Sequence, residues 1–430
     1  MKPSVGLKRR DFLKVAAAAI AFPYFVPASA RGQARRPAPS DRIVMAGIGI
    51  GNQGGGDNSV FQGMPDVQMV AICDVKKNIR DRAKANIDRR YNNSDCKAYT
   101  DFRELLQRPD IDAIHMAVPD HWHALLAVFA MLNGKDVYCQ KPLSLTVHEG
   151  RQMVLTANRL GRVFSCGSQR VWDDYKNVHR MVRSGSVGQV REGYVDNGGP
   201  SKPCDLGPEG LIPEGMDWDM WLGPAPMAPY NPKRCDGGYG LGGNTWRSYR
   251  EYSGGGMTDW GGHKIAAALF AMGLEHAGPV SVNPPDGKDY RYLTYTFANG
   301  AKLYHAPNAP ANLRDVSIVG TNGIARNQPG GRGGRGSPAP EVPAWDFDAY
   351  KGTRSIYDDF ILCVKTRQKP FQNAEVAHRA ASCCHLGNIC YWLNRPLKWD
   401  PAKEDFINDA EASRWLSRPM RAPWILPTNT

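Results

Sequence analysis

The stretch Gly47-Ile48-Gly49-Ile50-Gly51-Asn52-Gln53-Gly54 decides the fold of this chain of 430 residues. It directly follows an apolar, β-branched run at 42–48 that predicts a strand, and it opens a segment compatible with a helix. Gly49, Gly51 and Gly54 match the pattern G-x-G-x-x-G, in which glycine lets the chain turn tightly and approach a pyrophosphate. The N–H groups at the start of the helix add a partial positive charge. This stretch, including Asn52 and Gln53, therefore predicts a dinucleotide site.

An acidic residue follows at the distance that such a site requires. The run 67–73 predicts a second strand, and Asp74 comes directly after it, 23 residues beyond Gly51. A carboxylate at this place accepts hydrogen bonds from the ribose hydroxyls of the adenosine. It also repels a 2′-phosphate, so we expect NAD as the cofactor, with NADP as the alternative because Lys76 and Lys77 follow.

Strands and helices alternate beyond this motif. Further strands are predicted at 111–118 and 136–139, and helices at 76–91, 121–133 and 147–160. This alternation is typical of an α/β fold with a doubly wound parallel sheet. We therefore expect an NAD-binding Rossmann domain over residues 41–162.

The pattern changes after residue 162 and predicts an α+β domain over 163–430. Strand-like runs punctuated by hairpin signals indicate an open, mainly antiparallel sheet. A Gly/Pro/Arg stretch at 328–340 is typical of a solvated loop. The strands are expected at 290–298, 301–305 and 315–320, and the helices at 175–184, 259–272, 356–366 and 375–393.

The first residues are typical of an export signal. Arg9 and Arg10 precede a short apolar run from Val15 to Val26, which ends before a small-residue cleavage motif at 28–30. About twelve residues cannot cross a hydrocarbon core of ~30 Å, so no membrane span is expected in the mature chain. The pattern predicts a twin-arginine signal at 1–30, a linker at 31–40 and a periplasmic or other extracytoplasmic location. A general secretory signal or an uncleaved anchor is the alternative.

Composition and cysteine spacing exclude several classes of protein. Hydrophobic residues make up 42% and charged residues 22% of the chain, which argues against disorder. The net charge of +12 arises partly in the leader, and no nucleic-acid-binding motif accompanies it. None of the ten cysteines forms a C-x-x-C pair, so no metal site is expected. Cys204 and Cys235 lie in loop-like sequence, where a disulfide is one alternative, and the run 383–385 is expected to be buried packing.

Three further stretches carry a family resemblance. They are Ala117-Val-Pro-Asp-His-Trp-His123, Val137-Tyr-Cys-Gln-Lys-Pro142 and Gly254-Gly-Gly-Met-Thr-Asp-Trp-Gly-Gly-His263. Together they resemble the Gfo/Idh/MocA oxidoreductases, and the likeness extends over nearly all of the chain after the leader. The resemblance implies a homo-oligomer with a carbohydrate as its small-molecule substrate.

The resemblance also implies three catalytic residues, which are Lys141, Asp259 and His263. Oxidation of a carbinol carbon needs a base for the hydroxyl proton, and a histidine of ordinary pKa serves near neutral pH. Asp259 precedes His263 by four residues and would share its helical face, whereas Lys141 would polarise the substrate oxygen. A helix N-cap is the alternative role for Asp259.

Other residues depart from the family's pattern or extend it. Gln140 replaces the family's glutamate before Lys141, Ala266 replaces its aspartate after the histidine, and Lys264 stands where related exported proteins often have histidine. Pro119, His123, Gln140 and Gln169 are expected to contact the cofactor. Trp246 and Arg247 are expected to contact the substrate, because an aromatic platform and a bidentate donor suit a carbohydrate.

These observations predict an exported NAD(P)-dependent oxidoreductase that acts on a CH–OH group of a sugar, cyclitol or sugar derivative. One alternative is an NAD-dependent glycosidase, which oxidises a sugar carbon transiently and shows no net redox change. The other is a non-catalytic protein that binds a nucleotide.

Overall fold

The structure of the protein is a computed structural model that describes residues 37–235, 245–327 and 345–428. The expected leader at 1–30 and the loop at 328–340 lie outside the described residues, and so does most of the linker at 31–40. The chain divides into two compact units, Met1–Arg42 and Ile43–Thr430. The described part of the first unit contains one short 3-10 helix, η1 (Pro39–Asp41). The second unit contains both sheets and the other described helices.

A six-stranded parallel sheet forms the first layer of this unit, in the order β3-β2-β1-β4-β5-β6. Its strands are β1 (Ile43–Ile48), β2 (Val67–Cys73), β3 (Lys97–Tyr99), β4 (Ala113–Met116), β5 (Asp136–Gln140) and β6 (Phe164–Gly167). The order reverses at β1, which lies between β2 and β4, and ligands of such sheets bind at this point of reversal. The predicted doubly wound sheet is confirmed. It continues past residue 162, because β6 pairs with β5.

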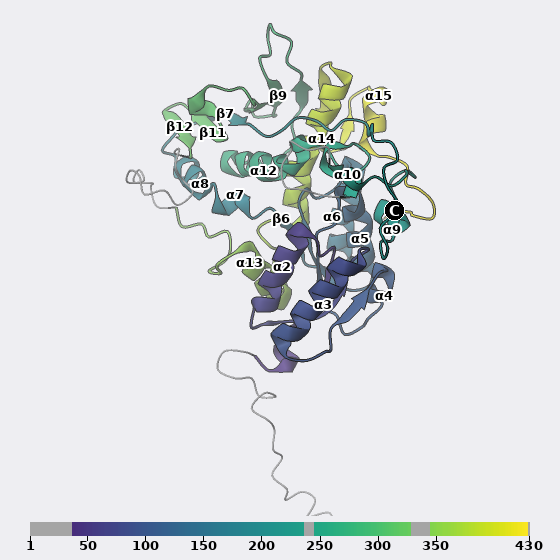
Figure 1. Cartoon of the computed structure of the whole chain (residues 1–430). Coiled ribbons are helices and arrows are strands. Elements are labelled where there is room, and N and C mark those ends of the chain that lie inside the picture. The colour runs from purple at the N-terminus through teal and green to yellow at the C-terminus, as the bar shows by residue number, and fades with distance from the viewer. Residues whose placement is uncertain (1–36, 236–244, 328–344, 429–430) are drawn as a thin grey trace, which may run out of the picture. The chain divides into compact units, whose positions relative to one another are not determined.

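Helices follow the strands of this sheet, as expected (Figure 1). They are α2 (Asn52–Gly63), α3 (Lys77–Tyr91), α4 (Phe102–Leu106), α5 (Asp120–Leu132) and α6 (Val147–Leu160). Helix α6 shows how the local sequence sets the bounds. The Thr146 side chain accepts from the Glu149 N–H, the Glu149 carboxylate accepts from the Thr146 N–H, and Gly161 ends the helix in the left-handed region.

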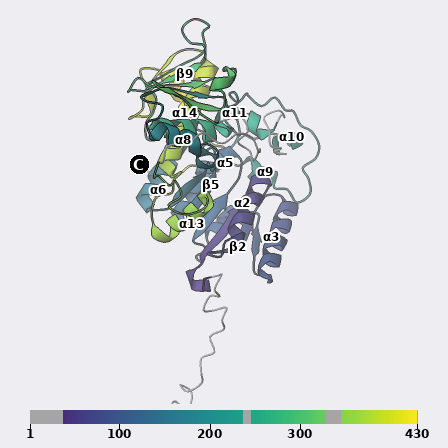
Figure 2. The same ribbon diagram turned by 90° about the vertical axis from the view of Figure 1, so that its left-hand side faces the viewer.

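The second sheet has eight strands, in the order β12-β11-β7-β10-β9-β8-β13-β14, and lies above the first in Figure 2. All neighbours whose pairing is registered are antiparallel except β7 and β10. This confirms the open, mainly antiparallel sheet, although the expected runs correspond only to β9, β10 and β11 and miss β7, which lies between β10 and β11. The strands are β7 (Val190–Val195), β8 (Ser281–Asn283), β9 (Leu293–Thr296), β10 (Lys302–His305), β11 (Val316–Gly320), β12 (Gly323–Arg326), β13 (Leu397–Asp400) and β14 (Asp405–Phe406).

Two helices connect the layers. Helix α12 (Gly261–Met272) contacts β7 and β11, and α14 (Ala374–Leu393) contacts both α12 and α6. Cys383 and Cys384 of α14 are fully buried in the hydrophobic core. The other helical elements are α7 (Arg170–Asp173), α8 (Lys176–Arg183), α9 (Trp218–Leu222), α10 (Pro232–Cys235), α11 (Gly256–Asp259), α13 (Ile356–Thr366), α15 (Ala410–Ser413), η2 (Trp246–Ser248), η3 (Ala311–Leu313) and η4 (Arg414–Leu416).

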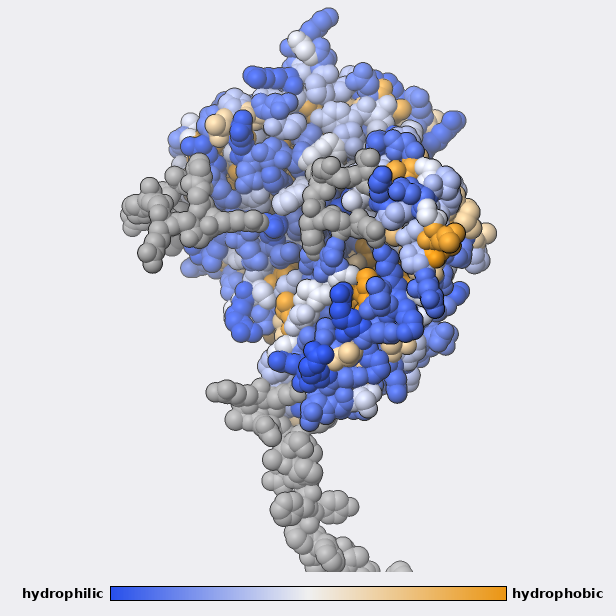
Figure 3. All heavy atoms as spheres, viewed as in Figure 1, coloured by the Kyte–Doolittle hydropathy of each residue, from blue (hydrophilic) through white to orange (hydrophobic). Residues whose placement is uncertain are grey.

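Three further findings concern the described residues as a whole. Cys204 and Cys235 do not form a disulfide in the structure, in contrast to the suggested pairing. No helix between residues 37 and 428, outside the two gaps, has the length and apolar character needed to cross a membrane. The face shown in Figure 3 is mainly hydrophilic, with small and separate hydrophobic patches.

Candidate active site

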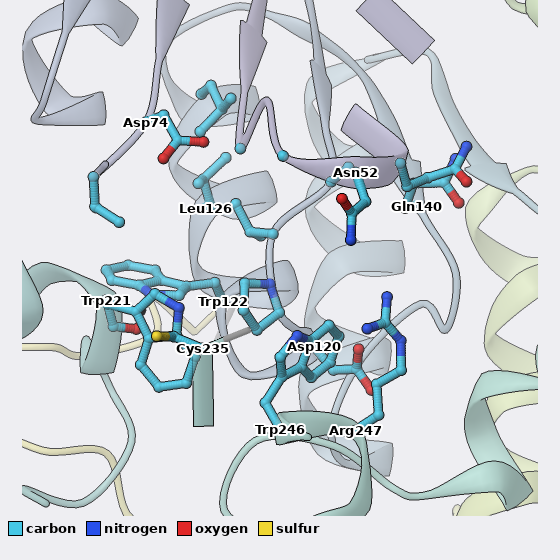
Figure 4. A pocket seen from close by; sticks show the side chains of 18 of the residues that line it. Asn52, Asp74, Asp120, Trp122, Leu126, Gln140, Trp221, Cys235, Trp246 and Arg247 are labelled. Carbon is cyan, nitrogen blue, oxygen red and sulfur yellow. Dashed lines mark hydrogen bonds between the residues drawn. The ribbon is translucent and has the colours of Figure 1, made fainter. Parts of the chain in front are cut away.

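A cavity of about 800 Å³ opens at the carboxyl ends of the first sheet. The ends of β1, β2, β4 and β5 contribute to its walls through Gly49, Asp74, Pro119 and Lys141. Segments of the second domain complete it, among them η2 and the start of α12. Figure 4 shows Trp246 and Arg247 of η2 at the cavity. This is the place where a doubly wound sheet binds its ligand.

The glycine-rich loop forms the edge of this cavity. A Cβ at Gly54 would lie 1.8 Å from the Gly49 carbonyl oxygen, and Gly49 itself has a φ of +74°. Gly51 differs, because a Cβ there would meet nothing within 4 Å. Gly51 is also the N-cap of α2, and as a glycine it has no side chain to cap the helix. Gly49 and Gly54 thus permit the tight turn, while Gly51 leaves the helix N-terminus open to an anionic group.

Asp74 lines the cavity and holds the loop in place. Its Oδ2 accepts a hydrogen bond from the Ile50 N–H at 2.8 Å, and its Oδ1 accepts one from the Lys76 N–H at 2.9 Å. Burial raises the pKa of this carboxyl, and the two backbone hydrogen bonds oppose the rise. Lys76 lines the cavity as well, whereas Lys77 does not and pairs with Asp81 on the surface.

Gln140 contacts a buried acid that the sequence did not reveal. Its Nε2 donates to Asp57 Oδ2 at 2.9 Å, while Gln53 and Tyr357 donate to Asp57 Oδ1 at 2.8 and 2.9 Å. Burial raises the pKa of Asp57, and these three hydrogen bonds lower it. A glutamate at position 140 would place a second carboxylate beside Asp57. The neutral Gln140 therefore donates a hydrogen bond to Asp57 and avoids the repulsion that a glutamate would cause.

The three predicted catalytic residues meet in the cavity. Lys141 Nζ donates to Asp259 Oδ1, and Arg247 Nε lies 3.8 Å from the same oxygen. Asp259 therefore lies between two cations. The alternative role as an N-cap is wrong, because α11 ends at Asp259 and Trp260 is the N-cap of α12.

His263 also lines the cavity but is only 4% exposed. Its Nδ1 is buried without a hydrogen-bond partner among the described residues. Burial lowers the pKa of His263 well below its ordinary value, and the positive charges of Lys141 and Arg170 lower it further. The imidazole is therefore neutral at pH 7 and a weaker base than its sequence position predicts.

Three other expected contact residues line the cavity. The Oε1 atom of Gln169 is buried without a partner in the described chain, so it can accept from a ligand N–H such as that of a carboxamide. The guanidinium of Arg247 stacks on Trp246 with its Cζ 4.3 Å from the ring centroid. Figure 4 shows both side chains beside Asp120, a residue that sequence reasoning did not single out.

His123 does not line the cavity, which differs from the expected cofactor contact. Its Nδ1 lies 2.6 Å from the Pro142 carbonyl oxygen and its Nε2 lies 2.9 Å from that of Val118. Burial lowers the pKa of His123 to about 4, so the neutral ring donates one of these hydrogen bonds. His123 therefore supports the backbone that carries Pro119, the N-cap of α5, and Lys141.

Lys264 and Ala266 do not line the cavity, and their contacts stabilise the fold. Lys264 Nζ pairs with Asp196 and lies 3.0 Å from Asp315 Oδ1, while Ala266 is buried in the hydrophobic core. In the part of the chain that the structure describes, no group of three or more His, Cys, Asp or Glu residues is arranged to hold a metal ion.

Comparisons with known proteins identify the family of both domains. Residues 42–168 match the oxidoreductase family's NAD-binding Rossmann fold, and residues 205–426 match the C-terminal alpha/beta domain of the same family. A glycosyl hydrolase family 109 protein of Shewanella putrefaciens is 32% identical over 208 residues. That match covers 44% of this chain and 45% of the relative, so the chain spans less than half the length of this relative.

Two solved structures share the fold. An aldose-aldose oxidoreductase from Caulobacter crescentus, complexed with glycerol, is 18% identical with a TM-score of 0.55, and the match covers 83% of this chain and 99% of that one. The WlbA dehydrogenase from Bordetella pertussis, in complex with NADH and UDP-GlcNAcA, is 14% identical with a TM-score of 0.56 and coverages of 84% and 99%. With both of its domains matched, the chain belongs to the Gfo/Idh/MocA oxidoreductase family and carries an NAD-binding Rossmann domain.

Proposed function

We propose that the protein transfers a hydride between NAD and a CH–OH carbon of a sugar, cyclitol or sugar derivative. The observation that carries this proposal is one cavity that holds both the glycine-rich loop with Asp74 and the cluster Lys141, Asp259 and His263. NAD supplies the group that accepts or returns the hydride. Residues of this chain bind the cofactor and the substrate and transfer the proton.

The described residues fit this cofactor. The open N-terminus of α2 suits the pyrophosphate, Asp74 suits the adenosine ribose, and Gln169 Oε1 suits the carboxamide N–H. Asp74 favours NAD, with NADP as the alternative because Lys76 lines the same cavity.

A carbohydrate fits the other end of the cavity. Trp246 offers an aromatic surface, and Arg247 and Lys141 offer N–H donors to hydroxyl oxygens. Lys141 stabilises negative charge that develops on the substrate oxygen, and the neutral His263 donates or accepts a hydrogen bond there. The relatives crystallised with UDP-GlcNAcA and named for aldoses support this substrate class.

A second candidate is an NAD-dependent glycosidase, and a specific observation favours it. The relative at 32% identity is a glycosyl hydrolase family 109 protein. Transient oxidation of a sugar carbon uses the same cavity but returns the hydride, so the nicotinamide shows no net change.

We also propose that the protein is exported and forms a homo-oligomer. The paired arginines and the short apolar run of residues 1–30 support export in a folded state by the twin-arginine route. A cofactor bound before export would then be carried to the periplasm.

The test is to load the full chain with NAD and record nicotinamide absorbance with a panel of sugars, cyclitols and aryl glycosides. A net rise of NADH supports the dehydrogenase, and aglycone release without that rise supports the glycosidase. Lys141→Ala is expected to lower kcat/KM by about 100-fold or more, because the cation near the substrate oxygen is lost. The exposed Lys398→Ala is the matched control and stays within about twofold of wild type. A chain that neither contains nor binds a nicotinamide nucleotide would contradict the proposal.

A further inference from the structure

Asp120 is a buried carboxyl with unusually few partners. It begins α5, is 2% exposed and lines the cavity beside Arg247 (Figure 4). Among the described residues its carboxylate accepts one hydrogen bond, from Ser253 Oγ to Oδ2 at 2.7 Å.

The other buried carboxyls of the described chain are better satisfied. Each of them accepts at least two hydrogen bonds from protein groups, as a charge removed from water requires. They are Asp57, Asp74, Asp136, Glu149 and Asp359. The fold therefore keeps Oδ1 of Asp120 at the cavity without a protein donor from the described residues.

The surroundings of Asp120 favour exchange of its proton. The pKa of Asp120 is raised to about 7, mainly by burial; Asp259 adds to the rise, and Ser253, Lys141 and Arg247 oppose it. The charge of Asp120 acts on the Cys139 thiol of β5, whose pKa burial raises well above its ordinary value, so this thiol is protonated. Both forms of the Asp120 carboxyl are therefore populated near neutral pH.

The two neighbouring candidates, His263 and Asp259, are poorly suited to accept the hydroxyl proton. The nitrogen lone pair of His263 is a weak base, because burial lowers its pKa well below the ordinary value. Asp259 is engaged by Lys141 and lies near Arg247. A proton acceptor works best when its pKa lies near the working pH, and Asp120 satisfies this condition.

We propose that Asp120 is a catalytic residue that exchanges a proton with the carbohydrate hydroxyl at the carbon undergoing oxidation, an assignment that rests on the proposed function. In the oxidising direction the hydroxyl proton moves to Oδ1 of Asp120, and the C–O single bond becomes a carbonyl. The hydrogen on that carbon leaves with its electron pair to the oxidised nicotinamide. Asp120 then releases its proton to solvent, and reduction reverses each step.

The test compares Asp120→Asn with wild type over pH 5 to 9. For wild type, kcat/KM for oxidation is expected to fall about tenfold per pH unit below about pH 7, where Asp120 becomes protonated. Asp120→Asn should lose this limb and lower kcat by 10²–10⁴-fold, the usual effect of general acid–base catalysis. Its dissociation constant for NAD should remain within about twofold, because the expected cofactor contacts are the glycine-rich loop, Asp74 and Gln169.

Two further variants sharpen the comparison. Ser253→Ala removes a hydrogen bond that favours the carboxylate, so the limb should move to higher pH with kcat retained above it. Asp110→Asn, at an exposed acid paired with Arg108, should match wild type throughout. Infrared difference spectra between pH 6 and 8 should show a titrating carboxyl in wild type that is missing in Asp120→Asn.

The outcomes separate this inference from the function beneath it. An active wild type whose rate and pH profile are unchanged in Asp120→Asn would overturn the role of Asp120 and leave the proposed function standing. The absence of turnover in wild type with every carbohydrate would overturn the proposed function and this inference with it.

Discussion

Asp74 combines two tasks at the edge of the cavity. Its carboxylate accepts the N–H groups of Ile50 and Lys76, which ties the glycine-rich loop to the start of α3. It also presents a negative charge where the adenosine ribose is expected to lie. Cofactor preference at this place therefore depends on the charge of one side chain and on which neighbouring lysine faces the cavity.

We predict that Asp74→Asn weakens NAD binding by 10- to 100-fold, because a hydrogen bond to a charged group contributes about 1.5–3 kcal/mol. Binding of NADP should improve relative to NAD, since repulsion of the 2′-phosphate is lost. In the Asp74→Asn background, Lys76→Ala should weaken NADP binding. Lys77→Ala should not, because Lys77 pairs with Asp81 away from the cavity. Isothermal titration of both nucleotides checks this, and equal effects of the two lysines would contradict it.

At the scale of elements, the start of α2 carries several glycines whose surroundings differ. The close approach of Gly54 to the Gly49 carbonyl leaves no room for a side chain, whereas Gly51 faces open space at the cavity. Gly56 is an exposed glycine in the same helix, and a Cβ there would also meet nothing within 4 Å. One helix thus offers a packing glycine, a binding glycine and a control.

We predict that Gly54→Ala lowers the free energy of unfolding by about 3 kcal/mol or more, because the backbone must move to admit the Cβ. Gly51→Ala should change stability by less than about 1 kcal/mol but weaken NAD binding by about tenfold or more. Gly56→Ala should stabilise the protein by about 0.5–1 kcal/mol and leave NAD affinity unchanged. Urea unfolding and nucleotide titration measure the three variants. A Gly51→Ala protein that binds NAD like wild type would contradict the assigned path of the pyrophosphate.

For the whole molecule, buried histidines lower stability in acid. All ten histidines lie in the described residues, and burial lowers the pKa of eight of them. These rings are neutral in the folded chain, whereas the unfolded chain binds protons at about pH 6.5. Their contribution to stability is therefore complete above about pH 6.5 and is lost as the pH falls toward the folded pKa values.

We predict that the free energy of unfolding falls steeply from pH 6.5 to pH 4. Each such histidine contributes up to about 1.4 kcal/mol per pH unit. His115, whose pKa burial lowers to about 3, offers a direct test, because its Nε2 meets Asn58 Oδ1 at 3.2 Å and glutamine can replace that contact. His115→Gln should reduce the slope by about one proton in urea titrations. An unchanged slope in His115→Gln would refute a neutral, buried His115.

Sequence by itself determined the parts of this protein that depend on neighbouring residues. Alternating strands and helices, the glycine-rich loop at 47–54 and Asp74 at the end of β2 follow from periodicity and turn chemistry, which operate over a few residues. The positions of Lys141, Asp259 and His263 followed from resemblance to a family whose residues recur at these places. The order of the eight-stranded sheet did not follow, because β7 pairs with β10 and β11, more than a hundred residues away.

Only the tertiary structure decided which distant side chains form hydrogen bonds with one another and how burial shifts their pKa values. Ser253 reaches Asp120 across 133 residues, and Tyr357 reaches Asp57 across 300. His123 turns to carbonyl oxygens instead of the cavity, and His263 becomes a neutral ring, although both resemble ordinary histidines in the sequence. The physical reason is that burial and long-range hydrogen bonds set the proton affinity of a group, and both arise only when distant segments pack together.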